Sequence, residues 1–142
     1  MSRQIKILIV ENSSNDTELL MRELYRAGFD PHWLRVDTEA DYLANLSPDL
    51  DLILSNYALP QFGGSRALAL LQKKRLEIPF IIVSGSNSVE IALKVMLEGA
   101  TDYVLKEQIA LFGQVVHQAV EDFEEQRSQT AGQKLVRQAE NL

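Results

Sequence analysis

The 142-residue chain contains no cysteine and only two histidines, His32 and His117. The absence of cysteine excludes disulfide bonds, thiolate chemistry and cysteine-based zinc sites. The two histidines are far apart in the sequence and lack the spacing of a metal-binding pair. The composition therefore gives no support to a redox centre or to a histidine-based metal site.

The chain also lacks a long hydrophobic run and a positive net charge. No apolar stretch approaches the ~20 residues that a membrane-spanning helix needs. The first residues, MSRQIKILIV, enter an apolar run without a signal-peptide cleavage site. The formal net charge is −6, and such a chain repels the phosphates of nucleic acids. We therefore expect a cytoplasmic domain that binds neither membranes nor nucleic acids.

Five short apolar runs alternate with segments of helical periodicity. The runs are IKILIV (5–10), HWLRV (32–36), DLILS (51–55), PFIIVSG (79–85) and DYVL (102–105). Continuous apolar runs rich in β-branched residues are typical of strands covered on both faces. A fifth helix is expected from Glu107 to about Arg127. Length and order predict one α/β domain, with a doubly wound parallel sheet and right-handed crossovers.

Polar residues follow several of these runs directly. Ligand and reaction sites of such sheets lie outside the carboxyl ends of the strands. This rule selects four loops, at residues 11–14, 56–64, 84–87 and 106–107. Asp49 and Asp51 precede the third run, so we place them at the opposite end of the sheet.

Over roughly residues 4–125, the chain resembles the receiver domains of two-component response regulators. The matching segments are ILIVEN (7–12), LILSNYALPQFGG (52–64), IIVSGS (81–86) and GATDYVLK (99–106), in the order and spacing of that family. The resemblance implies a five-stranded parallel sheet in the flavodoxin-like order 2-1-3-4-5, with helices on both faces. It also implies a signalling module and no enzyme.

The resemblance assigns roles to individual positions. By resemblance, the family's acidic pair maps onto Glu11 and Asn12, its phosphoacceptor aspartate onto Asn56, its hydroxyl onto Ser84, its lysine onto Lys106, its aromatic switch onto Tyr103 and its metal-binding carbonyl onto Ala58.

Two of these positions depart from the family, because Asn12 and Asn56 stand where it has aspartate. A carboxamide oxygen is neutral and its nitrogen lone pair is delocalised, so Asn56 is nearly inert as a phosphoryl acceptor. Mg²⁺ prefers anionic oxygens, and only Glu11 remains anionic among the family's metal-binding side chains. Lys106 could neutralise Glu11 directly. We predict a degenerate receiver without the phosphoacceptor, with weak or absent Mg²⁺ binding and no other cofactor.

Each of these residues also has a purely structural interpretation. Asn56 could hydrogen-bond its own loop, as asparagine often does in turns. Asn12 could cap the first helix. Ser84 could be a plain strand-end hydroxyl, or it could join Asn56 in a neutral hydrogen-bond network. Tyr103 could be a core residue instead of a switch.

We interpret the chain as a phosphorylation-independent pseudo-receiver that acts by protein–protein contact. The resemblance implies that a histidine kinase or an output domain binds the fourth helix, fifth strand and fifth helix, and a homodimer is a further option. One alternative is an ordinary phosphorelay receiver silenced by substitutions at Asn12 and Asn56. Another is a flavodoxin-like cofactor binder, in which ENSSND (11–16) would cradle a flavin phosphate; that stretch lacks glycine and is crowded by carboxylates.

The last part of the chain differs from the rest. We divide the chain into a receiver-like domain at 1–127 and a helical tail or linker at 128–142. The sequence is mostly polar after Phe123, Gly132 is a candidate hinge, and a weak apolar stripe follows at Leu135, Val136, Ala139 and Leu142. The tail is either a solvated helix end or a linker helix that leads to another domain or to a dimer partner.

Overall fold

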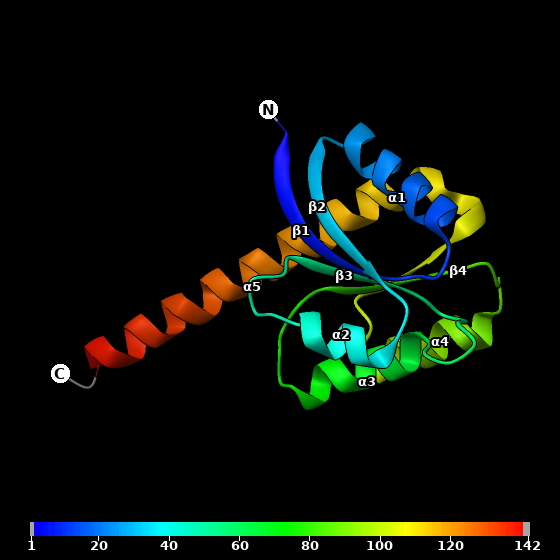
Figure 1. The fold of residues 1–142 in the computed structure, drawn as a ribbon. Helices are drawn as coiled ribbons and strands as arrows, with labels where there is room; N and C mark the ends of the chain where they lie inside the picture. Colours follow the sequence, from blue (N-terminus) through cyan, green and yellow to red (C-terminus); the bar gives the residue numbers. More distant parts are fainter. Residues whose placement is uncertain (1, 141–142) are drawn as a thin grey trace.

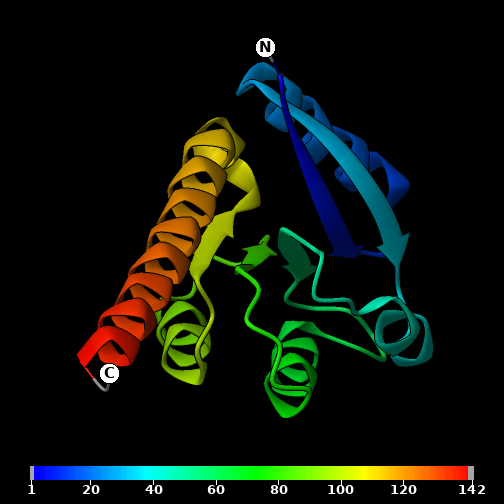
Figure 2. The same ribbon diagram turned by 90° about the vertical axis from the view of Figure 1, so that its left-hand side faces the viewer.

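The computed structural model describes the backbone of residues 2–140 and the side chains of residues 2–129. A five-stranded parallel sheet in the order β2-β1-β3-β4-β5 lies between two layers of helices. Helices α1 and α5 cover one face, and α2, α3 and α4 cover the other (Figures 1 and 2). The predicted fold class and strand order are therefore confirmed.

The elements follow the predicted alternation. The strands are β1 Arg3–Val10, β2 Phe29–Val36, β3 Leu52–Asn56, β4 Phe80–Ser84 and β5 Asp102–Leu105. The helices are α1 Ser14–Arg26, α2 Glu39–Asn45, α3 Gly64–Lys73, α4 Val89–Glu98, the 3₁₀ helix η1 Lys106–Leu111 and α5 Phe112–Glu140.

Residues 7–10 of β1, 52–54 of β3 and 80–83 of β4 are apolar and buried because helices cover both faces of the sheet there. Alternate residues of β1 enter one of two separate cores. Ile7 and Ile9 belong to the core beneath α1 and α5, whereas Leu8 and Val10 belong to the core beneath α2, α3 and α4.

The register of the sheet aligns the carboxyl ends of its strands. Val10 of β1 lies beside Ser55 of β3, and Asn56 lies beside Val83 of β4. Ser84 in turn lies beside Leu105 of β5. The polar residues that follow these strands are therefore brought to one edge of the sheet, as the rule for open α/β sheets requires.

The predicted fifth helix is wrong at both ends. Residues 106–111 form η1, and Gln108 has non-helical dihedral angles of φ −110° and ψ 34°. From Phe112, α5 continues without interruption to Glu140 and extends away from the sheet (Figure 1). The helix is unbroken at Gly132, because one glycine costs a helix only ~1 kcal/mol relative to alanine; the hinge stays a prediction. The proposed boundary at 127/128 falls inside α5 and stays a prediction; the side chains of the tail's apolar stripe lie outside the described residues.

Ser13 caps helix α1, so the capping role predicted for Asn12 is wrong. Ser13 has extended dihedral angles, and its Oγ accepts a hydrogen bond from the backbone N–H of Asp16 at 3.1 Å. This is the usual geometry for the residue immediately before a helix. Asn12 lies one residue too early to reach the same N–H groups.

The loop between β3 and α3 folds tightly back on itself. The N–H of Gly64 donates to the carbonyl oxygen of Tyr57 at 3.1 Å. A Cβ atom on Gly63 would lie 2.6 Å from that same oxygen. Because the obstructing atom belongs to the backbone, no side-chain rotation can relieve the contact. Gly63 therefore permits the loop conformation that follows Asn56.

We predict that Gly63→Ala lowers the free energy of unfolding by about 1–3 kcal/mol, the usual cost of overpacking. Gly85→Ala is the matched control, since a Cβ there meets nothing within 4 Å, and we expect it to change stability by less than about 0.5 kcal/mol. Urea denaturation of both variants measures the difference. Equal stability of the two variants would show that the close approach at Gly63 is not a constraint.

Candidate functional site

The carboxyl ends of β1, β3 and β5 bring three of the predicted site residues together. Glu11 directly follows β1, Asn56 ends β3, and Lys106 directly follows β5. Asn56 Nδ2 lies 3.3 Å from Glu11 Oε1, and Lys106 Nζ lies 3.7 Å from Glu11 Oε2. The candidate site is therefore centred on the Glu11 carboxylate.

The Glu11 carboxylate is almost completely buried, with 2% of the residue's surface exposed. Its Oε1 accepts hydrogen bonds from the backbone N–H groups of Asn12 at 3.0 Å and Ser13 at 3.1 Å. The amide of Asn56 supplies a third donor to the same oxygen. A buried carboxylate needs such partners because desolvation strongly disfavours its charge. N–H donors of the protein thus occupy the hydrogen-bonding positions of Glu11 Oε1.

Both ends of the Asn56 side chain are engaged within the protein. Its Nδ2 donates to Glu11, and its Oδ1 accepts from the N–H of Ala58 at 3.3 Å. The second bond is the local loop interaction that asparagine favours in turns. The first bond depends on the amide, because a carboxylate in that position would face Glu11 with two like charges. The amide group therefore lets the two side chains approach each other without a cation.

Lys106 is shared between two carboxylates. Its Nζ donates to Asp16 Oδ2 at 2.8 Å, a shorter distance than the 3.7 Å to Glu11 Oε2. The expected attraction between Lys106 and Glu11 is present, but the hydrogen bond is made to Asp16. The sequence patterns did not single out Asp16. The available signal was its position in the first turn of a helix that begins at the edge of the site.

Arg35 is a second charged residue that the sequence analysis missed. It lies near the end of β2, and its Nη1 donates to the backbone carbonyl oxygen of Glu11 at 3.2 Å. The contact holds the backbone just after β1. No sequence pattern links residues 24 positions apart, so only the pairing of β1 with β2 reveals it.

The remaining predicted positions lie around this centre. Ser84 is buried, but its Oγ accepts from the N–H of Ser86 at 3.1 Å, so the predicted neutral network with Asn56 is wrong. The cause is local: the loop after β4 turns its own N–H toward that hydroxyl. Asn12 contributes its backbone N–H, and its side chain is exposed. The carbonyl of Ala58 as a metal ligand stays a prediction.

Tyr103 packs as a core residue, and its role as a switch stays a prediction. Its ring is half-buried and packs against the core beneath α2, α3 and α4. Its hydroxyl donates to the carbonyl oxygen of Ser86 at 2.6 Å. The hydroxyl of Tyr103 thus links β5 to the β4–α4 loop, and its ring packs against the core.

The donor set at this site is a poor match for Mg²⁺. Glu11 offers only one oxygen without a hydrogen-bond donor, and that oxygen faces the Lys106 ammonium group. Asn56 is neutral, and Asp16 is engaged by Lys106. Among the described residues, no group of three or more histidine, aspartate or glutamate side chains could hold a metal ion. Since Mg²⁺ favours carboxylates, these residues do not fit a tightly held magnesium ion.

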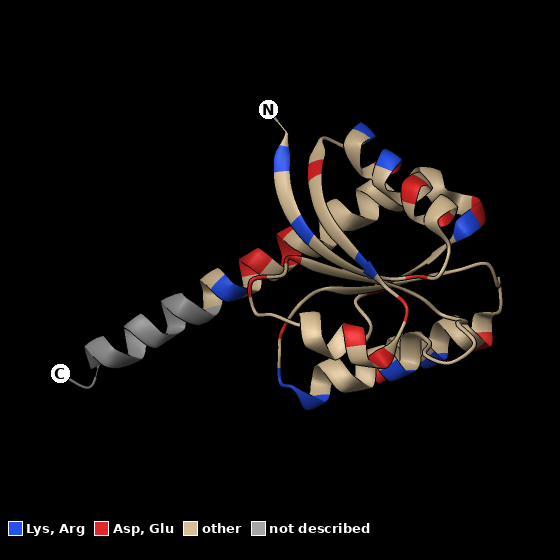
Figure 3. Ribbon diagram, viewed as in Figure 1, with Lys and Arg blue, Asp and Glu red and all other residues tan. Residues whose placement is uncertain are grey.

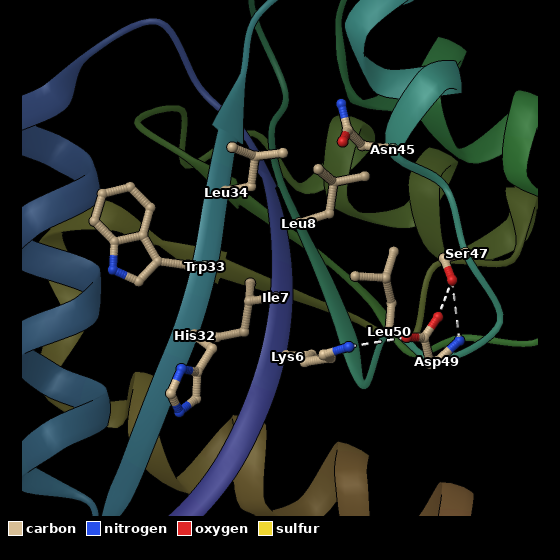
Figure 4. Close-up of a pocket in the computed structure, with 10 residues that line it drawn as sticks. All are labelled: Lys6, Ile7, Leu8, His32, Trp33, Leu34, Asn45, Ser47, Asp49 and Leu50. Atoms are coloured by element: carbon tan, nitrogen blue, oxygen red, sulfur yellow. Dashed lines mark hydrogen bonds and ion pairs between the residues drawn. The ribbon is translucent and has the colours of Figure 1, made fainter.

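A shallow groove of roughly 400 Å³ lies elsewhere, beside β1 and β2 (Figure 4). Lys6 Nζ donates to Asp49 Oδ2 at 2.9 Å along its edge. The hydrogen bond from Lys6 and its positive charge hold the pKa of the Asp49 carboxyl below its ordinary value. Asp49 precedes β3, so it lies at the amino end of that strand and cannot stand in for Asn56. The groove therefore adds nothing to the site at the carboxyl ends.

Comparison with known proteins identifies the family. The response regulator receiver domain family matches residues 7–115. The cell cycle transcriptional regulator CtrA of Caulobacter vibrioides is 28% identical over 102 residues, which are 72% of this chain and 44% of the relative. The two-component response regulator-like protein APRR9 of Arabidopsis thaliana is 30% identical over 105 residues, which are 72% of this chain and 22% of the relative. This chain thus spans less than half the length of either relative.

Solved structures share the fold. The signal receiver domain of a putative Luxo repressor protein from Vibrio parahaemolyticus has a TM-score of 0.75 at 20% identity, over 87% of this chain and 95% of that one. The signal receiver domain of the putative response regulator NarL from Mycobacterium tuberculosis has a TM-score of 0.72 at 16% identity, over 84% of this chain and 98% of that one. Within residues 2–140, none of the helices offers an apolar stretch of the length that a bilayer crossing requires.

The geometry predicts that Asn56→Asp makes the protein respond to Mg²⁺. Without the metal, the new carboxylate faces Glu11, and we expect the free energy of unfolding to fall by roughly 1–3 kcal/mol. Millimolar Mg²⁺ should restore stability by binding only the folded state. Thermal unfolding with Mg²⁺ or with a chelator measures the effect.

The wild-type protein and Asn45→Asp serve as controls. Asn45 is an exposed amide near the end of α2, so its conversion to a carboxylate adds the same charge away from Glu11. Neither control should gain stability from Mg²⁺. An equal gain in the wild-type protein would contradict a site completed by the Asn56 amide.

Proposed function

Because the chain belongs to the response regulator receiver domain family, we propose that it is a receiver-like signalling domain that acts by protein contact and accepts no phosphoryl group. The main support is the hydrogen bond from Asn56 Nδ2 to Glu11 Oε1. It joins the position of the phosphoacceptor to that of the metal-binding acid. We further propose that the domain has no enzymatic activity and works in the cytoplasm.

Chemistry supports the loss of phosphoryl transfer. A covalent acceptor needs a nucleophilic oxygen, and cations must offset the charge on the phosphoryl oxygens. Asn56 has no anionic oxygen, and its carbonyl oxygen already accepts from Ala58. The Lys106 ammonium group already contacts two carboxylates. Both the acceptor and the cation are thus engaged in bonds within the protein.

Helix α4 supports the contact function. It presents an apolar stripe to solvent, whereas the hydrophobic side chains of a surface helix normally face the protein core. The exposed fractions of its members are 79% for Val89, 58% for Leu93, 43% for Met96 and 79% for Leu97. We refer to these four residues as the α4 stripe. The charged residues of α4 are Glu90, Lys94 and Glu98, which form a separate line along the helix next to the apolar one; Figure 3 shows where charged residues lie along the chain.

Helix α4, which carries the α4 stripe, packs beside β5, and Tyr103 links β5 to the β4–α4 loop. We propose that a histidine kinase or an output domain binds this face of α4, β5 and α5. Four side chains cover less area than a stable interface needs, which is about 800 Å² on each partner. The contact must therefore include β5 and α5 as well. A second copy of the chain is the other candidate occupant.

One alternative, an ordinary receiver silenced by substitution, has a specific observation in its favour. Glu11 still contacts the residue at position 56, and Lys106 still lies 3.7 Å from Glu11 Oε2. No observation favours the other alternative, a flavin phosphate bound at the start of α1. The N–H groups of Asn12 and Ser13, which would bind such an anion, already donate to Glu11.

Incubation with acetyl phosphate and Mg²⁺ tests the loss of phosphoryl transfer. We expect intact-mass spectrometry to find no phosphoryl adduct on the wild-type chain, because the Asn56 amide cannot form a stable acyl phosphate. Asn56→Asp should show whether the pocket is otherwise competent. A phosphoryl group on a side chain of the wild-type candidate site would refute the proposal.

The contact function predicts that the double variant Leu93→Asp/Leu97→Asp changes association and leaves the fold intact. Both side chains are exposed, so the urea midpoint should stay within the range of ordinary surface substitutions, about 0.5 kcal/mol. Sedimentation over a range of concentrations should show that the variant associates less than the wild-type protein. Tyr25→Asp/Leu34→Asp is the control, since these hydrophobic side chains are also exposed but lie outside α4. If both double variants behave alike, the α4 stripe has no special role in self-association.

A further inference from the structure

Lys106 has a partner that the family motif does not include. Its Nζ donates to Asp16 Oδ2 at 2.8 Å, within the range of a strong charge-assisted hydrogen bond. The 3.7 Å to Glu11 Oε2 is too long for a hydrogen bond and leaves only an electrostatic attraction. Asp16 therefore determines the direction in which the ammonium group points.

The surroundings favour this arrangement over an approach to Asn56. Asp16 and Lys106 border a small slot whose other walls are Leu19, Leu20, Val83 and Ile109. Apolar walls accept the methylene chain of the lysine and exclude part of the solvent, which strengthens the ion pair. About a third of each side chain remains exposed, with 33% for Lys106 and 36% for Asp16. The pair is thus partly buried and packed against α1 and η1.

We infer that Asp16 is a positioning residue that holds Lys106 on the α1 side of the site and keeps its ammonium group from serving a phosphoryl acceptor at position 56. This inference rests on the proposed function and extends it to the regulation of the same site. Two separate features then prevent phosphoryl transfer at this site. One is the amide at position 56, and the other is the hydrogen bond between Asp16 and Lys106.

The consequence is that Asn56→Asp alone restores phosphoryl transfer incompletely. In that variant, an oxygen of the carboxylate introduced at position 56 would attack the phosphorus of acetyl phosphate. The new O–P bond forms as the bond from phosphorus to the acetyl oxygen breaks, and acetate leaves. A lysine ammonium group beside the transferring phosphoryl oxygens stabilises their charge. While Asp16 binds Lys106, that hydrogen bond must break first.

A set of variants in the Asn56→Asp background tests this coupling. Intact-mass spectrometry with acetyl phosphate and Mg²⁺ gives the rate of phosphorylation. Adding Asp16→Asn should raise the rate by about tenfold or more, since the lost bond joins two charged groups. Adding Glu18→Gln should leave the rate unchanged. Glu18 is an exposed acid on the same helix, so this control removes an equal charge without touching Lys106.

Lys106→Met separates a positioning role from a general charge effect. If Asp16 acts through Lys106, then Asp16→Asn accelerates the reaction only while Lys106 is present, as a double-mutant cycle reports. A second readout is the ζ-ammonium resonance of Lys106 in ¹H–¹⁵N NMR of the otherwise wild-type chain. The hydrogen bond to Asp16 should slow proton exchange and make the signal visible. Asp16→Asn should broaden it, and Glu18→Gln should not.

Three results would overturn the inference. These are no acceleration by Asp16→Asn, equal acceleration with and without Lys106, or a Lys106 ammonium signal that Asp16→Asn leaves unchanged. None of them depends on the wild-type chain being inert. Phosphorylation of the wild-type chain would instead refute the proposed function, so the two failures can be told apart.

Discussion

The hydrogen bond between the Asn56 amide and the buried Glu11 carboxylate is the interaction on which the character of this site depends. It joins the ends of β3 and β1, and the register of the sheet places the backbones of these two residues at adjacent strand ends. Two carboxylates at this distance would need a cation between them or a shared proton. An amide supplies N–H groups instead, so the protein satisfies Glu11 by itself. The same substitution removes the nucleophile and the need for a metal ion.

The rest of the site reinforces this arrangement. The N–H groups that precede α1 point at Glu11, and Arg35 holds the carbonyl oxygen of the same residue. Asp16 directs Lys106 toward α1. Under the proposed function, this site does not change state when phosphate or Mg²⁺ is present. Signalling by this domain would then depend on what its surface binds, and the exposed hydrophobic side chains of α4 are suited to such contacts.

The sequence was sufficient to predict the fold and the residues that meet at the carboxyl ends of the strands. Continuous apolar runs identified the strands, and parallel pairing then required Glu11, Asn56 and Lys106 to share one edge. Contacts that depend on exact loop geometry could not be predicted. Ser84 binds its own loop and not Asn56, and η1 interrupts the path into α5. The partnership of Lys106 with Asp16 spans 90 residues and follows only from the way α1 packs beside η1.

The side-chain amide resonances of Asn56 test the central interaction most directly. They can be assigned in the wild-type protein by ¹H–¹⁵N NMR and confirmed by their loss in Asn56→Asp. If Glu11 accepts one of these protons, that proton should resonate downfield, exchange slowly with water and keep its position when Mg²⁺ and beryllofluoride are added. Resonances that shift with saturable dependence on Mg²⁺ or beryllofluoride would show that the site binds these ions. The amide–carboxylate contact would then not be the stable ground state of this domain.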